Sequence, residues 1–150
     1  MFNNRKETLV KPFEIGDSAI DGLFGGMLAG FVMEIYLTMS GLLSDLQLSD
    51  ALTRISPIQG PRPVSGVLLH FAVSGIYGIL FGLVFSWVMQ RQTRRHWGWI
   101  AGTAYGALLL LMAVVFILPN NDSAIGEIPL IHLTVAHLLY GLILGLSIKR

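Results

Sequence analysis

Long apolar segments alternate with short polar ones along the chain. Four of these segments reach the roughly 20 apolar residues that a helix needs to cross a bilayer. They cover about residues 18–43, 64–90, 94–118 and 129–148. Inside hydrocarbon, every backbone amide must hydrogen-bond within its own helix or within a closed β-barrel. None of the four segments alternates polar and apolar residues as a barrel strand does, so each is expected to be a helix. The pattern predicts an all-α membrane protein, an antiparallel bundle of four transmembrane helices.

The segments between the helices differ in character. Residues 1–16 form a mixed-charge tail, so we expect the transmembrane domain to cover residues 17–150. Asp17 or Ser18 is expected to cap the first helix, and Pro119 to end the third. Residues 45–55 alternate leucines with polar residues, which is compatible with a short interfacial helix or with an ordinary loop.

The basic residues are distributed unequally between the two sides of the predicted bundle. Only Arg54 and Arg62 fall on one side. Eight lie on the other: Arg5, Lys6, Lys11, Arg91, Arg94, Arg95, Lys149 and Arg150. By the positive-inside rule, we expect a multi-pass protein of a prokaryotic cytoplasmic (inner) membrane with both termini in the cytoplasm.

Small residues recur every fourth position in each span, which places them on one helix face. The glycines of this pattern are Gly22, Gly26, Gly30, Gly78, Gly82, Gly98, Gly102, Gly106, Gly141 and Gly145. Small residues allow close approach of helix backbones in lipid, so we expect these faces to pack against other helices or against a partner. The large residues opposite are expected to face lipid or another subunit: Phe24, Phe31, Leu80, Phe81, Leu108 to Leu111, Leu142 and Leu144.

The composition supports a membrane protein and excludes several other classes. Hydrophobic residues make up 53% of the 150 residues and charged residues only 13%, too few for the polar shell of a soluble enzyme or a nucleic-acid-binding domain. There is no cysteine, and no phosphate-binding loop, zinc motif or catalytic triad is recognisable. We therefore predict a protein that is not an enzyme, with no catalytic residues and no metal site.

A few polar side chains fall inside the spans: Glu34, His70, Ser74, His132, His137 and Tyr140. Three interpretations compete for them. In the first, Glu34 and a histidine form a proton or ion relay. In the second, His70 and His132, at similar depth, are axial haem ligands. In the third, the polar groups only hydrogen-bond the helices together. The last is favoured at this point, because one carboxyl is fewer than a proton path usually contains.

The second and fourth spans share a short signature, Tyr77-Gly78 followed by Gly82 and Tyr140-Gly141 followed by Gly145. This similarity indicates two repeated helical hairpins. The stretches GGMLAGFVMEIYLTM, HFAVSGIYGILFG, GWIAGTAYGALLLLMAVVFILP and AHLLYGLILG resemble an uncharacterised family of small four-helix prokaryotic integral membrane proteins, a domain of unknown function. The resemblance implies the fold and supplies no activity.

For the function, the first expectation is a non-catalytic accessory subunit that packs against a larger membrane complex, such as a respiratory or photosynthetic electron-transfer complex. One alternative is a small oligomeric transporter or channel with Glu34 as its ion or proton site, and another is a haem- or quinone-binding membrane anchor. We expect membrane lipids and larger membrane subunits, or further copies of this chain, as partners, and no nucleic acid. No cofactor is expected beyond bound lipid or quinone, with haem at His70 and His132 as the alternative.

Overall fold

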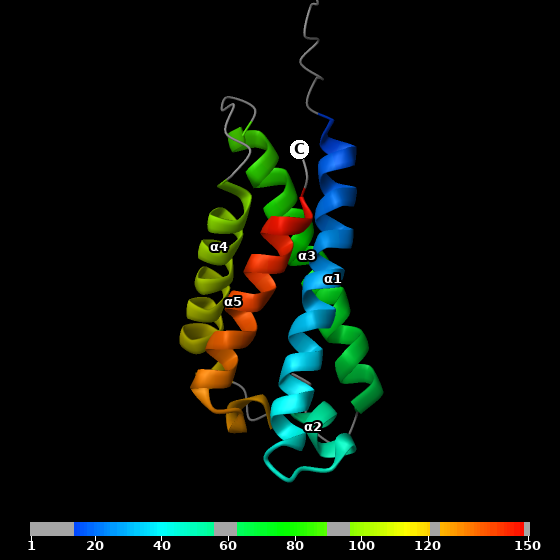
Figure 1. The fold of residues 1–150 in the computed structure, drawn as a ribbon, viewed down its shortest axis with the longest axis vertical. Coiled ribbons are helices and arrows are strands. Elements are labelled where there is room, and N and C mark those ends of the chain that lie inside the picture. The colour runs from blue at the N-terminus through cyan, green and yellow to red at the C-terminus, as the bar shows by residue number, and fades with distance from the viewer. Residues whose placement is uncertain (1–13, 56–62, 90–96, 121–123, 149–150) are drawn as a thin grey trace, which may run out of the picture.

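The computed structural model describes residues 14–55, 63–89, 97–120 and 124–148 (Figure 1). These residues form a bundle of four long helices, α1 (Ile15–Leu42), α3 (Pro63–Met89), α4 (Gly98–Met112) and α5 (Leu130–Ser147). With α4 continued to Ile117, all four are long and apolar enough to cross a membrane. The predicted fold class is confirmed.

The four helices form two antiparallel hairpins that pack against each other. α1 packs on α3, α4 packs on α5, and the hairpins join mainly where α1 lies against α5. In Figure 1, α5 lies between α4 and α1, and the start of α1 and the end of α5 lie at the same end of the bundle. We call this the terminal end and the opposite one, which carries α2 (Leu48–Arg54), the α2 end.

Glycine faces bring the two helices of each hairpin together. In the first hairpin, a Cβ atom added to Gly26 would lie 2.7 Å from the Cα of Gly78. In the second, a Cβ on Gly102 would lie 2.7 Å from the Cα of Gly145. Real Cβ atoms do not approach backbone this closely, so only glycine fits at these crossings. Both hairpins are therefore built by the same packing device, and the glycine faces are buried within the chain.

Three large residues that were expected to face outwards are buried instead. Phe81 is 5% exposed, Leu109 9% and Leu144 0%, whereas Phe24 of α1 and Leu108 of α4 are at least half exposed, as expected. The expectation was wrong for these three because each helix has more than one packed face. Leu144 packs beside Gly25 of α1, where an added Cβ would lie 3.3 Å from its Cδ1, and Phe81 packs on Tyr105 of α4 with ring centroids 5.1 Å apart.

The ends of the helices differ in part from those predicted. α1 begins at Ile15, and Glu14 occupies the cap position, so neither Asp17 nor Ser18 is the cap. The Ser18 hydroxyl lies inside the helix and donates to the Glu14 carbonyl (3.1 Å). At its far end, Asp45 follows in the left-handed region (φ 61°), which Asp tolerates better than most residues. The predicted tail, apart from residues 14–16, and the predicted start of the third helix at 94 lie outside the described residues.

Two features refine the predicted connections. Residues 48–54 form the short helix α2, so this part of the 45–55 segment is helical. α4 widens into a π-turn, η2 (Ala113–Ile117), just before Pro119. A proline has no N–H and its ring clashes with the carbonyl four residues earlier, and a wider turn relieves that clash. The helical path then ends in a 3-10 turn, η3 (Leu118–Asn120).

Candidate functional site

A group of polar side chains lies where α1, α3 and α5 meet. We call it the central cluster: Glu34 on α1, His70 and Ser74 on α3, and His137 and Tyr140 on α5. All five were singled out in the sequence as intramembrane polar residues. The structure places them on three different helices at a similar depth, as the following contacts establish.

The register of α1 against α3 sets Glu34 opposite His70. A Cβ on Gly30 would lie 2.5 Å from the Cβ of Ser74, so these two residues face each other. The helices are antiparallel, so one turn onward in α1 and one turn back in α3 bring Glu34 level with His70. A Cβ on Gly30 would also lie 3.9 Å from His70 Nε2, which places the imidazole beside the space that Gly30 leaves open.

The Glu34 carboxyl is buried and unpaired. The residue is 6% exposed, and neither carboxyl oxygen has a hydrogen-bond partner among the described residues. His70 Nε2 is equally inaccessible and also lacks a partner there. A buried ionised carboxylate without a partner is costly, so the Glu34 carboxyl favours its neutral, protonated form. The carboxyl and this imidazole nitrogen are therefore two buried polar groups that are not hydrogen-bonded to each other or to any other described residue.

α5 completes the cluster through His137 and Tyr140. The Tyr140 hydroxyl donates a 2.7 Å hydrogen bond to the Ser74 carbonyl, so α5 reaches across to α3. His137 lies three residues before Tyr140 in the same helix. Its Nδ1 lies 2.8 Å from the Leu133 carbonyl, and it is therefore the protonated nitrogen of this ring. The other nitrogen of His137 is then the acceptor of the neutral ring.

His132 lies apart from the central cluster, towards the α2 end. Its Nδ1 is 3.0 Å from the Tyr36 hydroxyl, and the two rings lie 6.0 Å apart. No hydrogen bond or ring contact given for the described residues joins His132 to His70. The haem interpretation needs the two imidazoles to face each other, whereas the contacts of the described residues pair His132 with Tyr36.

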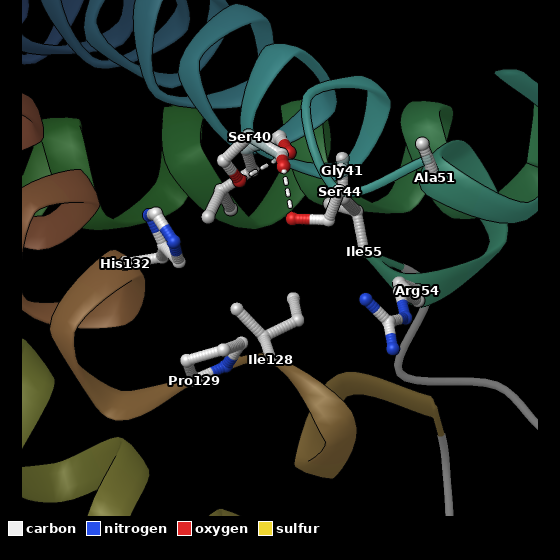
Figure 2. Close-up of a pocket in the computed structure, with 10 residues that line it drawn as sticks. Ser40, Gly41, Ser44, Ala51, Arg54, Ile55, Ile128, Pro129 and His132 are labelled. Carbon is white, nitrogen blue, oxygen red and sulfur yellow. Dashed lines mark hydrogen bonds between the residues drawn. The ribbon is translucent and has the colours of Figure 1, made fainter. Parts of the chain in front are cut away.

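A small cavity opens beside His132 between α1, α2 and the start of α5 (Figure 2). Its volume of about 20 Å³ has room for roughly one water molecule. Figure 2 shows the Ser40 and Ser44 side chains above it and Arg54 at its side. Arg54 forms an exposed 3.3 Å ion pair with Glu127, which joins α2 to the 3-10 turn η4 (Ala124–Glu127) before α5.

Neither site has the donors for a metal ion. Across the four described stretches, no three His, Cys, Asp or Glu side chains gather closely enough to hold one. The central cluster offers a single carboxyl and two imidazoles on separate helices. Carboxyl and imidazole groups of this kind can exchange protons and form hydrogen bonds.

Several residues that shape these sites escaped the sequence analysis. Tyr36 pairs with His132, and the Tyr105 hydroxyl donates a 3.0 Å hydrogen bond to the Tyr77 carbonyl, a second link between the hairpins. An available signal was that tyrosine inside a span needs a partner for its hydroxyl. Which carbonyl provides it depends on the helix register, which the sequence leaves open.

Comparisons with known proteins give a family and no activity. A family model described as a family of unknown function, DUF6789, matches residues 17–150. The match covers all four long helices and the central cluster. Searches of curated proteins and of solved structures found no match.

Proposed function

This chain belongs to the family of unknown function DUF6789, and we propose that it is a small oligomeric transporter or channel that uses Glu34 as an intramembrane ion or proton site. The observation that carries the proposal is the state of the Glu34 carboxyl. It is 6% exposed, and neither of its oxygens is hydrogen-bonded to a described residue. An ionisable group held in this way inside a membrane bundle is typical of an ion or proton pathway.

The competing structural role is weaker for Glu34 than for its neighbours. A side chain that merely ties helices together must hydrogen-bond across them, as Tyr140 does to Ser74 and Tyr105 does to Tyr77. Glu34 makes no such bond to the described residues. Burial of the Glu34 carboxyl therefore destabilises the folded bundle without a compensating hydrogen bond between helices, which favours a functional reason for this residue.

A role as accessory subunit of an electron-transfer complex remains the alternative. The glycine faces that seemed suited to docking are occupied by contacts inside the two hairpins, so they give that role no support. The outward faces are rich in large apolar side chains, which lipid alone would satisfy. The four helices enclose little volume, so a transport path would need several copies of the chain.

We further propose a cytoplasmic membrane location with the terminal end of the bundle in the cytoplasm. The eight basic residues of the tail, the 90–96 segment and the C-terminus support this orientation. The α2 end, with Arg54, Glu127 and the small cavity, then faces outwards. Glu34 lies 19 residues after the start of α1, about 29 Å along the helix axis, which puts it in the outer half.

The experiment is a flux assay in proteoliposomes that contain the purified full-length chain and an internal pH-sensitive dye. A potassium diffusion potential drives proton entry, and the same vesicles are assayed with sodium and potassium tracers. We expect Glu34→Gln to abolish the protein-dependent flux, since a neutral amide cannot release a proton or balance a cation. Glu127→Gln removes an exposed carboxylate outside the bundle core and serves as the matched control.

Two outcomes would overturn the proposal. One is a flux in the Glu34→Gln protein equal to that of the wild type. The other is mass spectrometry of gently extracted membranes that finds the chain in stoichiometric complex with larger subunits and never as a homo-oligomer, which would establish the accessory role.

A further inference from the structure

We infer that the small cavity at the α2 end is the entrance through which water and small cations reach Glu34, and that the Leu37 side chain closes this entrance. The inference deepens the proposed function and rests on it for its transport aspect. Its core, the control of access to position 34 by Leu37, can be measured without any transport.

One face of α1 connects the turn of Glu34 to the cavity. Three residues that line the cavity follow Glu34 at spacings of three, seven and ten: Leu37, Gly41 and Ser44. With 3.6 residues per turn, all three lie within about 80° of Glu34 around the helix axis. The cavity therefore continues the Glu34 side of α1 towards the α2 end, and its nearest wall residue is one turn from the carboxyl-bearing residue.

Leu37 stands between the cavity and the turn of Glu34. The residue is 5% exposed, belongs to the buried core and forms part of the cavity wall. Side chains on a helix lean towards its N-terminus, so a residue covers the turn before its own Cα. Leu37 therefore covers the turn that carries Glu34, and its apolar side chain separates that turn from the cavity.

The walls of the cavity lead from the surface to the core. Ser44 and Pro129 are exposed, His132 is half-buried, and Ile128 and Leu37 are buried. In Figure 2, Ser44 lies above the cavity, and Pro129 and Ile128 lie below it. The cavity is thus reached from the α2 end and ends at Leu37.

The cavity also offers partners for a water molecule. The Ser40 and Ser44 hydroxyls donate to the carbonyls of Leu37 (2.8 Å) and Ser40 (2.9 Å), so both hydroxyl oxygens can still accept. His132 uses its Nδ1 with Tyr36, which leaves Nε2 of the ring for a further partner. A buried water makes about two to four hydrogen bonds, which these groups can supply. The cavity is therefore suited to hold a water in the last position before Leu37.

The opposite direction offers no comparable route between α1 and α3. Towards the terminal end, the two helices meet backbone to backbone, and a Cβ on Gly26 would lie 2.7 Å from the Cα of Gly78. The path is also longer on that side. Glu34 lies about 12 Å along the axis from Leu42, the last residue of α1, and about 29 Å from Ile15, the first. The α2 end is therefore the nearer and less tightly packed approach.

The test measures how fast silver ions, which are small and do not dissolve in lipid, react with Glu34→Cys in the full-length chain in nanodiscs. The natural chain has no cysteine, so a maleimide added after unfolding reports the thiol that is still free. We expect Leu37→Ala to speed the reaction on the order of tenfold, because deletion of a buried leucine side chain leaves a space that its neighbours only partly fill. Leu144→Ala removes another buried leucine, on the terminal side of Glu34, and is the matched control. Equal rates in the Leu37→Ala and Leu144→Ala proteins overturn the inference.

A filled cavity tests whether the route passes through it. Ser40→Leu, added to the Glu34→Cys protein with Leu37→Ala, places an apolar side chain at the cavity wall and should return the silver reaction towards its slow rate. A rate that stays fast would mean that silver arrives by another route, and the inference would fail. If the Leu37→Ala protein does not fold, Leu37→Val gives the same comparison with a smaller expected increase, and no increase in that folded protein overturns the inference.

The proteoliposome assay separates this inference from the proposed function. A Glu34-dependent flux that rises in the Leu37→Ala protein, together with faster silver reaction, supports both. A Glu34-dependent flux in the natural chain, with a silver reaction that does not depend on Leu37, overturns the entrance and leaves the proposed function intact. If no Glu34-dependent flux of any ion occurs, the proposed function fails, and the silver reaction alone decides whether the cavity leads to position 34.

Discussion

Tyr140 of α5 donates a 2.7 Å hydrogen bond from its hydroxyl to the backbone carbonyl of Ser74 on α3. That carbonyl also faces Gly26 of α1, so one backbone oxygen lies at the junction of three helices. The close approach depends on glycine at position 26, and the tyrosine then joins the second hairpin to the first. The central cluster is therefore built on a helix junction whose geometry is fixed by backbone contacts.

Loss of the Tyr140 hydroxyl should weaken the bundle modestly. Tyr140→Phe keeps the buried ring and removes only the donor to the Ser74 carbonyl. Hydrogen bonds between membrane helices contribute on average about 0.6 kcal/mol and up to about 1.7 kcal/mol, and we expect a decrease in the free energy of unfolding in that range. The measurement is equilibrium unfolding in mixed detergent micelles. Tyr105→Phe, which removes the 3.0 Å bond to the Tyr77 carbonyl, should cost a similar amount. An unchanged stability in both variants would contradict the role given to these two bonds.

The glycine crossings should tolerate no side chain. A Cβ at Gly78 would lie 2.6 Å from the Cα of Gly26, so Gly78→Ala must push α1 and α3 apart. Overpacking of this kind costs about 1–3 kcal/mol, which the same unfolding assay would detect. Gly16 has nothing within 4 Å of an added Cβ, and Gly16→Ala is the matched control. That change should be neutral or stabilise by up to about 1 kcal/mol, because alanine is the better helix former. A Gly78→Ala protein as stable as the Gly16→Ala protein would show that the helices do not cross so closely.

The elements that depend on local pattern were predictable from the sequence, and those that depend on pairing were not. Apolar length predicted the four helices, and four-residue spacing predicted that Gly26 and Gly102 lie on packing faces. Nothing in the spacing says that Gly26 meets Gly78 while Gly102 meets Gly145, because every span carries a similar stripe. The outward orientation expected for Phe81 and Leu144 failed for the same reason, since a helix with two neighbours buries residues on both sides of its glycine face.

The candidate site was predictable in its members and not in its arrangement. Glu34, His70 and His137 stood out because ionisable side chains are rare inside membrane spans. That Glu34 lies level with His70, while His132 pairs with Tyr36, follows only from the register of the packed helices. Register is set by many small contacts summed along each crossing, which no single motif reports.

The orientation in the membrane can be tested by cysteine labelling, since the natural chain has no cysteine. Ser49→Cys places an exposed thiol on α2, and Glu14→Cys places one just before α1. With eight basic residues predicted on the cytoplasmic side, a membrane-impermeant maleimide should label position 49 in intact cells. Position 14 should react only after the membrane is permeabilised. The reverse pattern would invert the proposed topology, and labelling of both in intact cells would place the two positions on the same, outer side.

The contact between the two hairpins is open to a direct test by a disulfide across α1 and α5. A Cβ on Gly25 would lie 3.2 Å from the Cβ of Ser147, close to the spacing of about 3.5–4.5 Å found in disulfides. In the double variant Gly25→Cys with Ser147→Cys, mild oxidation should therefore form an intrachain bond, seen as faster migration of the monomer in non-reducing gels and reversed by reductant. Gly16→Cys with Ser147→Cys is the control, because position 16 has no neighbour within reach. If the first pair gave only crosslinked dimers, α1 and α5 would meet between two copies of the chain, and the junction that holds Glu34 opposite His70 and beside α5 would have to form across a subunit interface.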